Sequence, residues 1–242
     1  MGQTVRGRLY LTLTMMLMVG LCLGLLLLRS TATGEFRFGF LVWNLILAVI
    51  PYPFALLSDV LLRTKTWLAA APSAVMWLLF LPNSPYLVTD LIHLEPQNVP
   101  FWYDALLYGS FALTGVLLGF ASVALIHTAI RDRFGMVRGW SVAFLSLGLS
   151  AYGIYLGRIE RWNSWNAIGS PRILAERVLA PLHSPLQNAR TIAFVGLYAA
   201  FLCIGYLAVA SIGAAFATSS IPLSTSEGLT SQTDGSNGVN RL

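Results

Sequence analysis

Long hydrophobic stretches, separated by shorter polar connections, dominate the chain. A helix needs about 20 predominantly apolar residues to cross the hydrocarbon core of a bilayer. Six stretches are long enough, near residues 9–28, 38–57, 66–82, 104–127, 139–157 and 190–214. The pattern predicts an all-α fold, a polytopic transmembrane helical bundle of about six spans.

The composition agrees with a membrane protein. Only 10% of the residues are charged and 56% are hydrophobic, whereas a soluble domain carries about 25% charged residues. The net charge of +5 rests almost wholly on arginine, since Lys65 is the only lysine. The arginines lie between the apolar stretches, where membrane orientation and anionic headgroups explain them better than nucleic acid does. We therefore expect the lipid bilayer as a partner, and no nucleic acid.

The chain divides into a membrane domain and a tail. Residues 1–217 form the multi-span domain, and residues 218–242 are rich in Ser, Thr, Gly and Asn. Such a tail cannot bury enough apolar surface to offset its ordering entropy, so we predict that it is disordered. The first apolar stretch is longer than the 7–15 residues of a signal peptide, which favours an uncleaved span. Cleavage near residues 31–34 is the alternative.

The distribution of basic residues predicts the orientation. The third loop has no Lys or Arg and three carboxylates, while the short fourth loop carries Arg131, Arg133 and Arg138. Basic loops stay on the cytoplasmic side, so the N-terminus is expected inside. Five arginines in the fifth loop argue against this orientation unless some of them are functional. With six spans, the third and fifth loops lie on one membrane face in either orientation.

A first polar segment, PNSPYLVTDLIHL, follows the third stretch at residues 82–94. Pro82 and Pro85 cannot continue a helix without losing a hydrogen bond, so the span should end or break there. If a short helix follows, polar side chains at i, i+3, i+4 and i+7 share one face. These side chains belong to Tyr86, Thr89, Asp90 and His93. Discontinuous helices build membrane sites in this way.

The chemistry of this segment points to Asp90 and His93. Three residues apart on a helix, they can act as acid and base, or share a proton or a metal ion. An alternative keeps the segment structural. Asn83, Ser84 and Thr89 lie near prolines and can cap helices or form turns, and tyrosine and histidine commonly lie at headgroup level.

A second polar segment, GRIERWNSW, follows the fifth stretch at residues 157–165. Arg158, Arg161 and Trp165 fall on one helical face. The planar guanidinium suits a carboxylate or phosphate, and could equally pair with Asp90. The alternative is an interfacial belt, because Trp and Arg at the end of a span are common anchors.

Two further features predict a surface helix and a contact between helices. Residues 171–183 alternate apolar and charged positions, which predicts an amphipathic helix on the membrane surface. Short interfacial helices are thus expected in loops three and five. Asn44, inside the second apolar stretch, predicts an interhelical hydrogen bond.

The motifs FLPNSPYLVTDLIHL, FWYD and YLGRIERWNSW together resemble the bacterial membrane family designated domain of unknown function 1361. The resemblance covers nearly the whole chain except the tail. It implies an integral protein of the bacterial inner (cytoplasmic) membrane and carries no established activity. This chain departs from the family pattern at Glu160, where an apolar residue is usual, and at Asn166, where aspartate is usual.

The leading hypothesis is a composite site on the outer face, built from residues 83–104 and 157–166. Asp90 and His93 would be the catalytic or metal-binding candidates, and arginines would hold an anionic group beside aromatic side chains. The candidate substrate-binding residues are Asn83, Tyr86, Thr89, Trp102, Asp104, Arg158, Arg161, Trp162, Asn163 and Trp165. Such a site suits an enzyme or binder of an anionic lipid or lipid-linked substrate.

Two other function classes stay open. A transporter is disfavoured because the sequence shows no internal repeat and no charges in mid-span. A non-catalytic accessory protein would use an Asp90–Arg158 or Asp90–Arg161 pair to lock helices together. The sequence holds no nucleophile motif, phosphate-binding loop or cofactor fingerprint, so no reaction, metal or cofactor is assigned.

Overall fold

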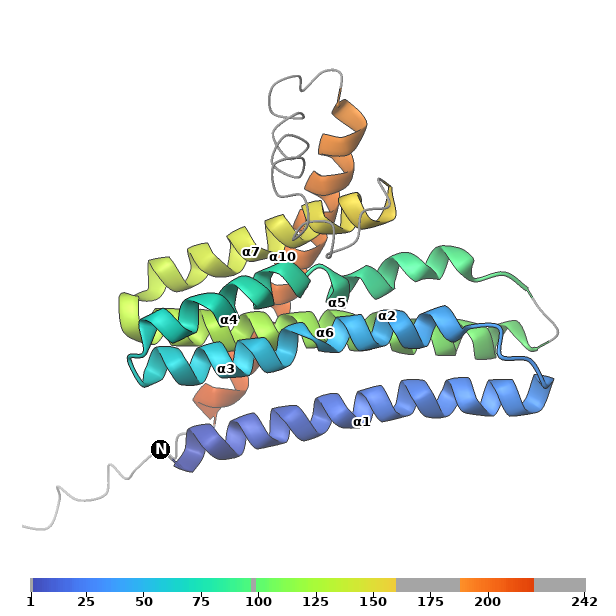
Figure 1. The fold of residues 1–242 in the computed structure, drawn as a ribbon, viewed down its shortest axis with the longest axis horizontal. Coiled ribbons are helices and arrows are strands. Elements are labelled where there is room, and N and C mark those ends of the chain that lie inside the picture. Colours follow the sequence, from blue (N-terminus) through green and yellow to red (C-terminus); the bar gives the residue numbers. More distant parts are fainter. Residues whose placement is uncertain (1, 97–98, 160–187, 220–242) are drawn as a thin grey trace, which may run out of the picture. The chain divides into compact units, whose positions relative to one another are not determined.

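The computed structural model describes residues 2–96, 99–159 and 188–219, and these residues form helices joined by short connections (Figure 1). No strand occurs among them. Six helical segments are long and apolar enough to cross a membrane, namely Val5–Thr33, Gly39–Arg63, Leu68–His93, Phe101–Phe134, Met136–Arg158 and Ala189–Ala215. The all-α class and the six predicted spans are confirmed, and the multi-pass architecture places the protein in a lipid bilayer.

The first span and the last three extend beyond the apolar stretches that predict them, because their polar ends continue the same hydrogen-bonding pattern, whereas the second and third are divided into shorter helices. Their bounds are α1 Gly2–Thr33, α2 Gly39–Val49, α3 Pro51–Arg63, α4 Trp67–Phe80, α5 Asn83–Tyr86, the 3-10 helix η1 Leu87–His93, α6 Phe101–Phe134, α7 Met136–Arg158 and α10 Ala189–Ser219.

The chain separates into two compact units, Met1–Ile204 and Gly205–Leu242. The first unit contains α1 to α7 and the beginning of α10, and the described part of the second is the remainder of α10. The predicted tail lies outside the described residues except for its first two positions, which belong to α10. The predicted amphipathic helix at 171–183 also lies outside them.

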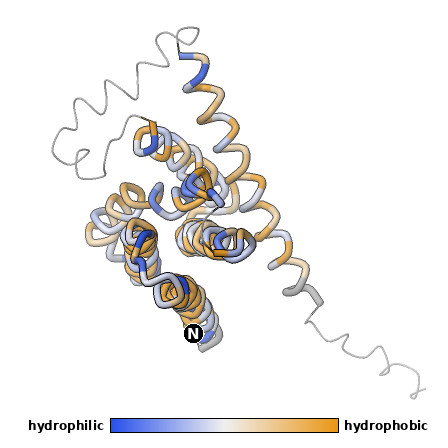
Figure 2. Tube along the Cα trace, turned by 90° about the vertical axis from the view of Figure 1, so that its right-hand side faces the viewer, coloured by the Kyte–Doolittle hydropathy of each residue, from blue (hydrophilic) through white to orange (hydrophobic). Residues whose placement is uncertain are grey.

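Helix α6 is the centre of the first unit. It packs against α1, α2, α3, α5, η1 and α7, and it is the most deeply buried of the six candidate spans. Its Leu107, Tyr108 and Phe111 join a core with Leu41 and Leu45 of α2. Hydrophobic residues make up much of each helix (Figure 2), and many large hydrophobic side chains of α1, α6 and α10 are exposed. This distribution suits a bundle surrounded by lipid.

Charged side chains mark two levels along α1. Arg8 lies near its beginning and pairs with Asp59 of α3, whereas Arg29 lies near its end and pairs with Asp104 of α6. Twenty-one residues separate the two arginines, or about 32 Å of helix. The hydrocarbon core of a bilayer is about 30 Å thick. We call these levels the Arg8 end and the Arg29 end.

Candidate functional site

The first polar segment breaks the third span between the two ends of the bundle, where Ser84 lies against Gly115 and Gly119 of α6, and it continues to the Arg29 end. Helix α4 ends at Phe80, and α5 and η1 carry the chain onward in shorter turns. Ser84 ties α5 to α2, since its hydroxyl donates to the main-chain oxygen of Ala48 at 2.7 Å. Tyr198 of α10 donates to the main-chain oxygen of Pro85 at 2.9 Å. The main-chain oxygen of Pro85, at the helix break, therefore has a donor from a neighbouring helix.

Glycines let α5 lie close to its neighbours. A Cβ at Gly115 of α6 would collide with the main-chain oxygen of Ser84, and one at Gly153 of α7 would lie 2.5 Å from Cγ of Pro82. A Cβ at Gly119 would lie 3.3 Å from that of Ser84. Small residues in membrane helices permit such close backbone approach. The Gly115 and Gly119 pattern thus serves the placement of the polar segment.

The guanidinium of Arg158, at the end of α7, contacts four polar groups of this segment. Its Nη1 donates to Oη of Tyr86 at 3.3 Å and to Oδ1 of Asp90 at 3.4 Å. Its Nη2 donates to the main-chain oxygen of Thr89 at 3.1 Å and lies 3.1 Å from Nε2 of His93. Because guanidinium nitrogens only donate, Nε2 of His93 is the acceptor here. We call these five residues the Arg158 cluster.

Asp90 is the buried member of the cluster, with 1% of its surface exposed. Asn44 of α2 donates to its Oδ2 at 2.8 Å, so each carboxylate oxygen has a donor. Asp90 also interacts electrostatically with Arg158 and His93. A buried charge is costly unless it is paired and hydrogen-bonded, and here both conditions are met.

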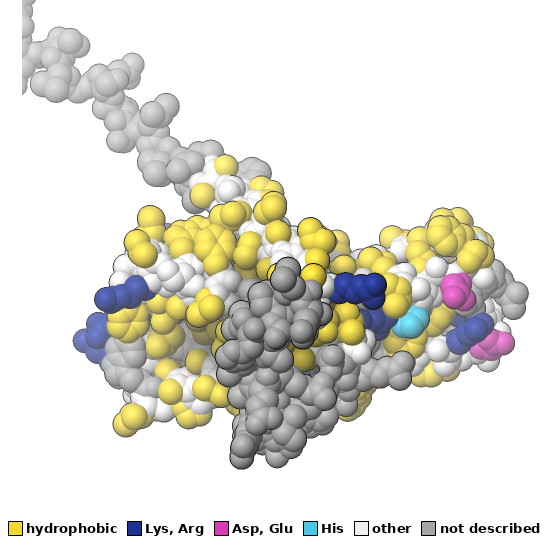
Figure 3. Space-filling view, turned by 90° about the horizontal axis from the view of Figure 1, so that it is seen from above, with side chains coloured by type: hydrophobic (Ala, Val, Ile, Leu, Met, Phe, Trp, Pro, Cys, Tyr) yellow, Lys and Arg dark blue, Asp and Glu magenta, His cyan; other side chains and the backbone are white. Residues whose placement is uncertain are grey.

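The cluster opens outward from Asp90. The side chain of Arg158 is 19% exposed, and His93 is exposed and stands edge-on to the ring of Phe40, with centroids 5.5 Å apart. On one face of the molecule a histidine side chain lies beside basic side chains among mainly hydrophobic ones (Figure 3). The cluster therefore offers an accessible cation and imidazole, backed by a buried carboxylate.

The structure brings together part of the sequence-predicted site. Tyr86, Thr89, Asp90, His93 and Arg158 meet as described above, although Thr89 contributes its main-chain oxygen while its hydroxyl donates to the main-chain oxygen of Tyr86 at 2.7 Å. The helix that carries them is a 3-10 helix after Tyr86, rather than the regular short helix whose spacing suggested the grouping.

Other predicted residues make different contacts. Asn83 donates to the main-chain oxygen of Phe80 at 3.1 Å. Trp102 is 66% exposed and touches the ring of Tyr103. Asp104 is buried and pairs with Arg29 at 2.7 and 3.2 Å. Arg161, Trp162, Asn163 and Trp165 lie outside the described residues.

Sequence reasoning missed three neighbours of the site. Asn44 was predicted to bond across helices, but its partner Asp90 was not foreseen. Arg29 falls just after the predicted stretch 9–28, yet it is part of α1, is buried against Asp104 and lies 4.1 Å from the ring centroid of Phe38. Tyr108 follows Asp104 by one turn and interacts electrostatically with both Asp90 and Asp104. Polar residues within apolar runs were the available signal for Asn44 and Tyr108.

A metal ion would need several ligands in one place. Among the residues that the structure describes, no three His, Cys, Asp or Glu side chains are grouped so as to hold one. The groups that meet here are a guanidinium, an imidazole 3.1 Å from it and a carboxylate that accepts from an amide. A guanidinium suits a carboxylate or phosphate by its planar geometry.

Comparison with known proteins supplies the family. The model of the family described as protein of unknown function (DUF1361) matches residues 43–204, a range that includes Asn44, α5, η1 and the end of α7. Searches of curated proteins and of solved structures find no match. The matched range covers about two thirds of the chain, and the chain therefore belongs to the DUF1361 family.

Proposed function

We propose that the Arg158 cluster binds the anionic group of a lipid or lipid-linked substrate. The observation that carries this proposal is the loose coordination of Arg158, which shares its donors among four acceptors at 3.1 to 3.4 Å while remaining partly exposed. A phosphate or carboxylate offers shorter, charge-assisted bonds to a guanidinium. An arriving anion would therefore replace weak neutral acceptors with stronger ones.

The surroundings favour a substrate with an apolar chain. Ile92 is 70% exposed and Phe40 is 38% exposed, and both lie next to members of the cluster. The cluster also lies at the ends of membrane-spanning helices, where headgroups and acyl chains meet. In this arrangement Arg158 holds the anion, His93 accepts or returns a proton at Nε2, and Asp90 orients the guanidinium.

Two short connections support an outward-facing cluster. The connection after η1 has no Lys or Arg, whereas Arg131, Arg133 and Arg138 flank the short connection between α6 and α7. Short basic connections stay on the cytoplasmic side. Arg161, Arg172 and Arg177, between α7 and α10, argue against this orientation, so it is tested directly below.

A ligand titration tests the site. Purified protein in mild detergent is titrated with farnesyl phosphate, and with farnesol as the uncharged control, while the melting temperature is followed. We expect farnesyl phosphate to stabilise the wild type and to lose this effect in Arg158→Gln, with farnesol inert in both. An equal response to the two lipids, no response to either, or an undiminished response in Arg158→Gln would refute the proposal.

A structural lock is the competing function, favoured by the Asp90–Arg158 contact itself. The melting temperature without ligand separates the two. Asp90→Asn keeps an acceptor for Asn44 and should melt near the wild type if the cluster is a binding site. A large loss in both Asp90→Asn and Arg158→Gln, with no ligand response in the wild type, would favour the lock.

Impermeant thiol labelling tests the orientation. Lys65→Cys and Glu95→Cys place exposed thiols at opposite ends of the bundle. We expect position 95 to react in intact cells and position 65 to react only after the membrane is opened, and the reverse result would place the cluster on the cytoplasmic side.

A further inference from the structure

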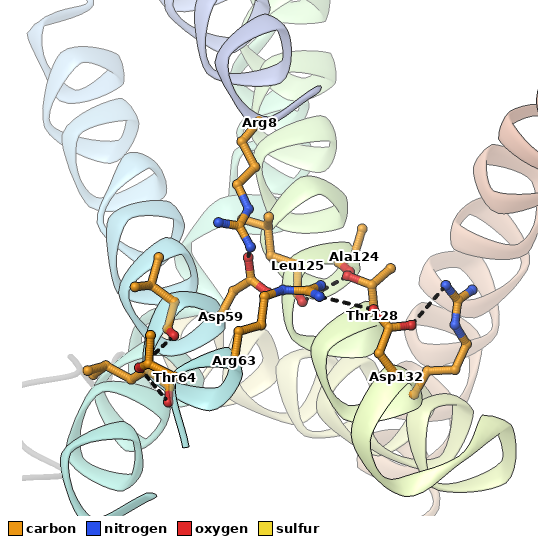
Figure 4. A network of polar contacts seen from close by, with 11 residues as sticks. Arg8, Asp59, Arg63, Thr64, Ala124, Leu125, Thr128 and Asp132 are labelled. Carbon is orange, nitrogen blue, oxygen red and sulfur yellow. Dashed lines mark hydrogen bonds and ion pairs between the residues drawn. The ribbon is translucent and has the colours of Figure 1, made fainter. Parts of the chain in front are cut away.

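At the Arg8 end, three helices share a network in which arginines outnumber carboxylates (Figure 4). Asp59 of α3, 1% exposed, pairs with Arg8 of α1 and accepts from Nε of Arg63 at 2.6 Å. Arg63 also reaches Asp132 of α6 at 3.1 Å, and Arg131 lies 3.4 Å from the same carboxylate. Two carboxylates thus serve three arginines, which leaves positive charge at this surface.

The turn after Arg63 adds a fourth cation in an unusual conformation. Lys65 has φ of +63°, in the left-handed region that favours glycine. The main-chain N–H of Thr66 donates to Leu61 at 3.1 Å and that of Lys65 to Leu62 at 3.4 Å, the pairing of a helix terminus that usually has glycine at this position.

A lysine at this position needs an explanation, because glycine would form the same turn without strain. Backbone strain at a non-glycine residue is a recognised marker of function. Lys65 is exposed, it is the only lysine in the chain, and it lies two residues after Arg63 of the network. Its side chain adds a long, mobile positive charge to the end of α3.

The level of this network along the bundle is that of lipid headgroups. Arg8 is separated from Arg29 by about 32 Å of helix, close to the thickness of the hydrocarbon core. Arg131 and Asp132, near the end of α6, are exposed. Basic clusters at this depth attract the phosphates of anionic phospholipids.

We propose that the end of α3, the turn at Lys65 and the end of α6 form a second binding surface, which takes the phosphate of an anionic phospholipid. Lys65 and Arg131 supply the exposed donors, while Arg63 is held in place by Asp59 and Asp132. This surface is distinct from the Arg158 cluster, because it lies beside the beginning of α7 at Met136, whereas Arg158 is the last residue of that helix.

Native mass spectrometry of delipidated protein tests the proposal. Dioleoyl phosphatidylglycerol is titrated against dioleoyl phosphatidylcholine, and the ratio of their dissociation constants for the first bound lipid is compared among variants. We expect the preference for phosphatidylglycerol to fall about fivefold in Lys65→Gly and about 25-fold in the Lys65→Gly, Arg131→Gln double variant. Lys65→Gly should melt at or above the wild-type temperature, because glycine relieves the strained turn.

A control variant makes the result specific. Arg190→Gln removes one exposed positive charge from the Arg29 end and should keep the wild-type preference for phosphatidylglycerol. Arg158→Gln removes the cation of the other proposed site and is measured to assign the lipid to one end or the other. An equal loss in Arg190→Gln would indicate non-specific attraction, loss in Arg158→Gln alone would assign the lipid to the other end, and an unchanged double variant would overturn the proposal.

Discussion

Two buried carboxylates at the Arg29 end are paired with arginines in contrasting ways. Asp104 receives two hydrogen bonds from Arg29, at 2.7 and 3.2 Å, and the two side chains are 2% and 3% exposed. Asp90 receives one contact from Arg158 at 3.4 Å, and the arginine is 19% exposed. We call Asp104–Arg29 the closed pair, because both side chains are buried, and Asp90–Arg158 the open pair, because its arginine is partly exposed.

This difference in burial and coordination distinguishes an ion pair that holds helices together from one whose arginine can bind a ligand. In the closed pair both partners depend on each other, since an unpaired charge at that depth is costly. In the open pair Asp90 also has Asn44 as a donor at 2.8 Å, so it does not rely on Arg158 alone. Arg158 in turn divides its donors among neutral oxygens and an imidazole, which an anion can displace.

The largest expected effect is that of opening the closed pair. Arg29→Gln leaves Asp104 buried without a cation, and we expect a loss of about 3 to 5 kcal/mol in the free energy of unfolding. Unfolding in mixed detergent measures it. Arg158→Gln is the matched substitution and should cost markedly less, because Asn44 still donates to Asp90. Equal losses in the two variants would show that the pairs are alike and that both are locks.

The next largest loss of stability is expected when the polar segment is pushed away from α6. Gly115→Ala places a methyl group against the main-chain oxygen of Ser84, and overpacking of this kind costs about 1 to 3 kcal/mol. Gly109→Ala on the same helix is the control, since an added Cβ there meets nothing within 4 Å. Gly115→Ala should also weaken the response to farnesyl phosphate. A full response in a destabilised Gly115→Ala protein would mean that the position of α5 does not set the geometry of the Arg158 cluster.

The fold was predictable because the bilayer imposes a single length on every span. Six apolar stretches correspond to six candidate spans. Pro82 and Pro85 lie where the third span changes from the long helix α4 to the short helices α5 and η1. The short helix after Tyr86 is a 3-10 helix, a type that spacing alone does not distinguish from an α-helix over seven residues. With three residues per turn, Asp90 and His93 still share a face, so that pair was grouped correctly.

The partners within the site were less predictable, because they depend on tertiary contacts. Spacing allowed Asp90 to pair with either Arg158 or Arg161, and the structure shows the contact with Arg158. Asp104 was assigned to the site because it follows the same loop, whereas its buried partner Arg29 lies 75 residues away in sequence. No local sequence pattern predicts an ion pair between residues so far apart in the chain.

A smaller effect comes from weakening the second donor of Asp90. Asn44→Ala removes a 2.8 Å bond to a buried carboxylate, and we expect a loss of about 1 to 2 kcal/mol in stability. Asp90 should then depend on Arg158, which makes the open pair resemble the closed one. A double-variant measurement checks this. Arg158→Gln should lower the free energy of unfolding more in the Asn44→Ala background than in the wild type. Simple addition of the two losses would contradict this sharing of Asp90.

The smallest expected effect concerns Thr89, whose side chain the sequence placed in the site. Its hydroxyl donates to the main-chain oxygen of Tyr86 at 2.7 Å, and Arg158 contacts only its main-chain oxygen, at 3.1 Å. Thr89→Val therefore keeps the contact with Arg158, and we expect a stability change within about 0.5 kcal/mol and a wild-type response to farnesyl phosphate. Tyr86→Phe is the companion variant, because it removes a hydroxyl that accepts from Arg158 at 3.3 Å. If Thr89→Val abolishes the response and Tyr86→Phe does not, the threonine hydroxyl binds the ligand, and the open pair rearranges on binding.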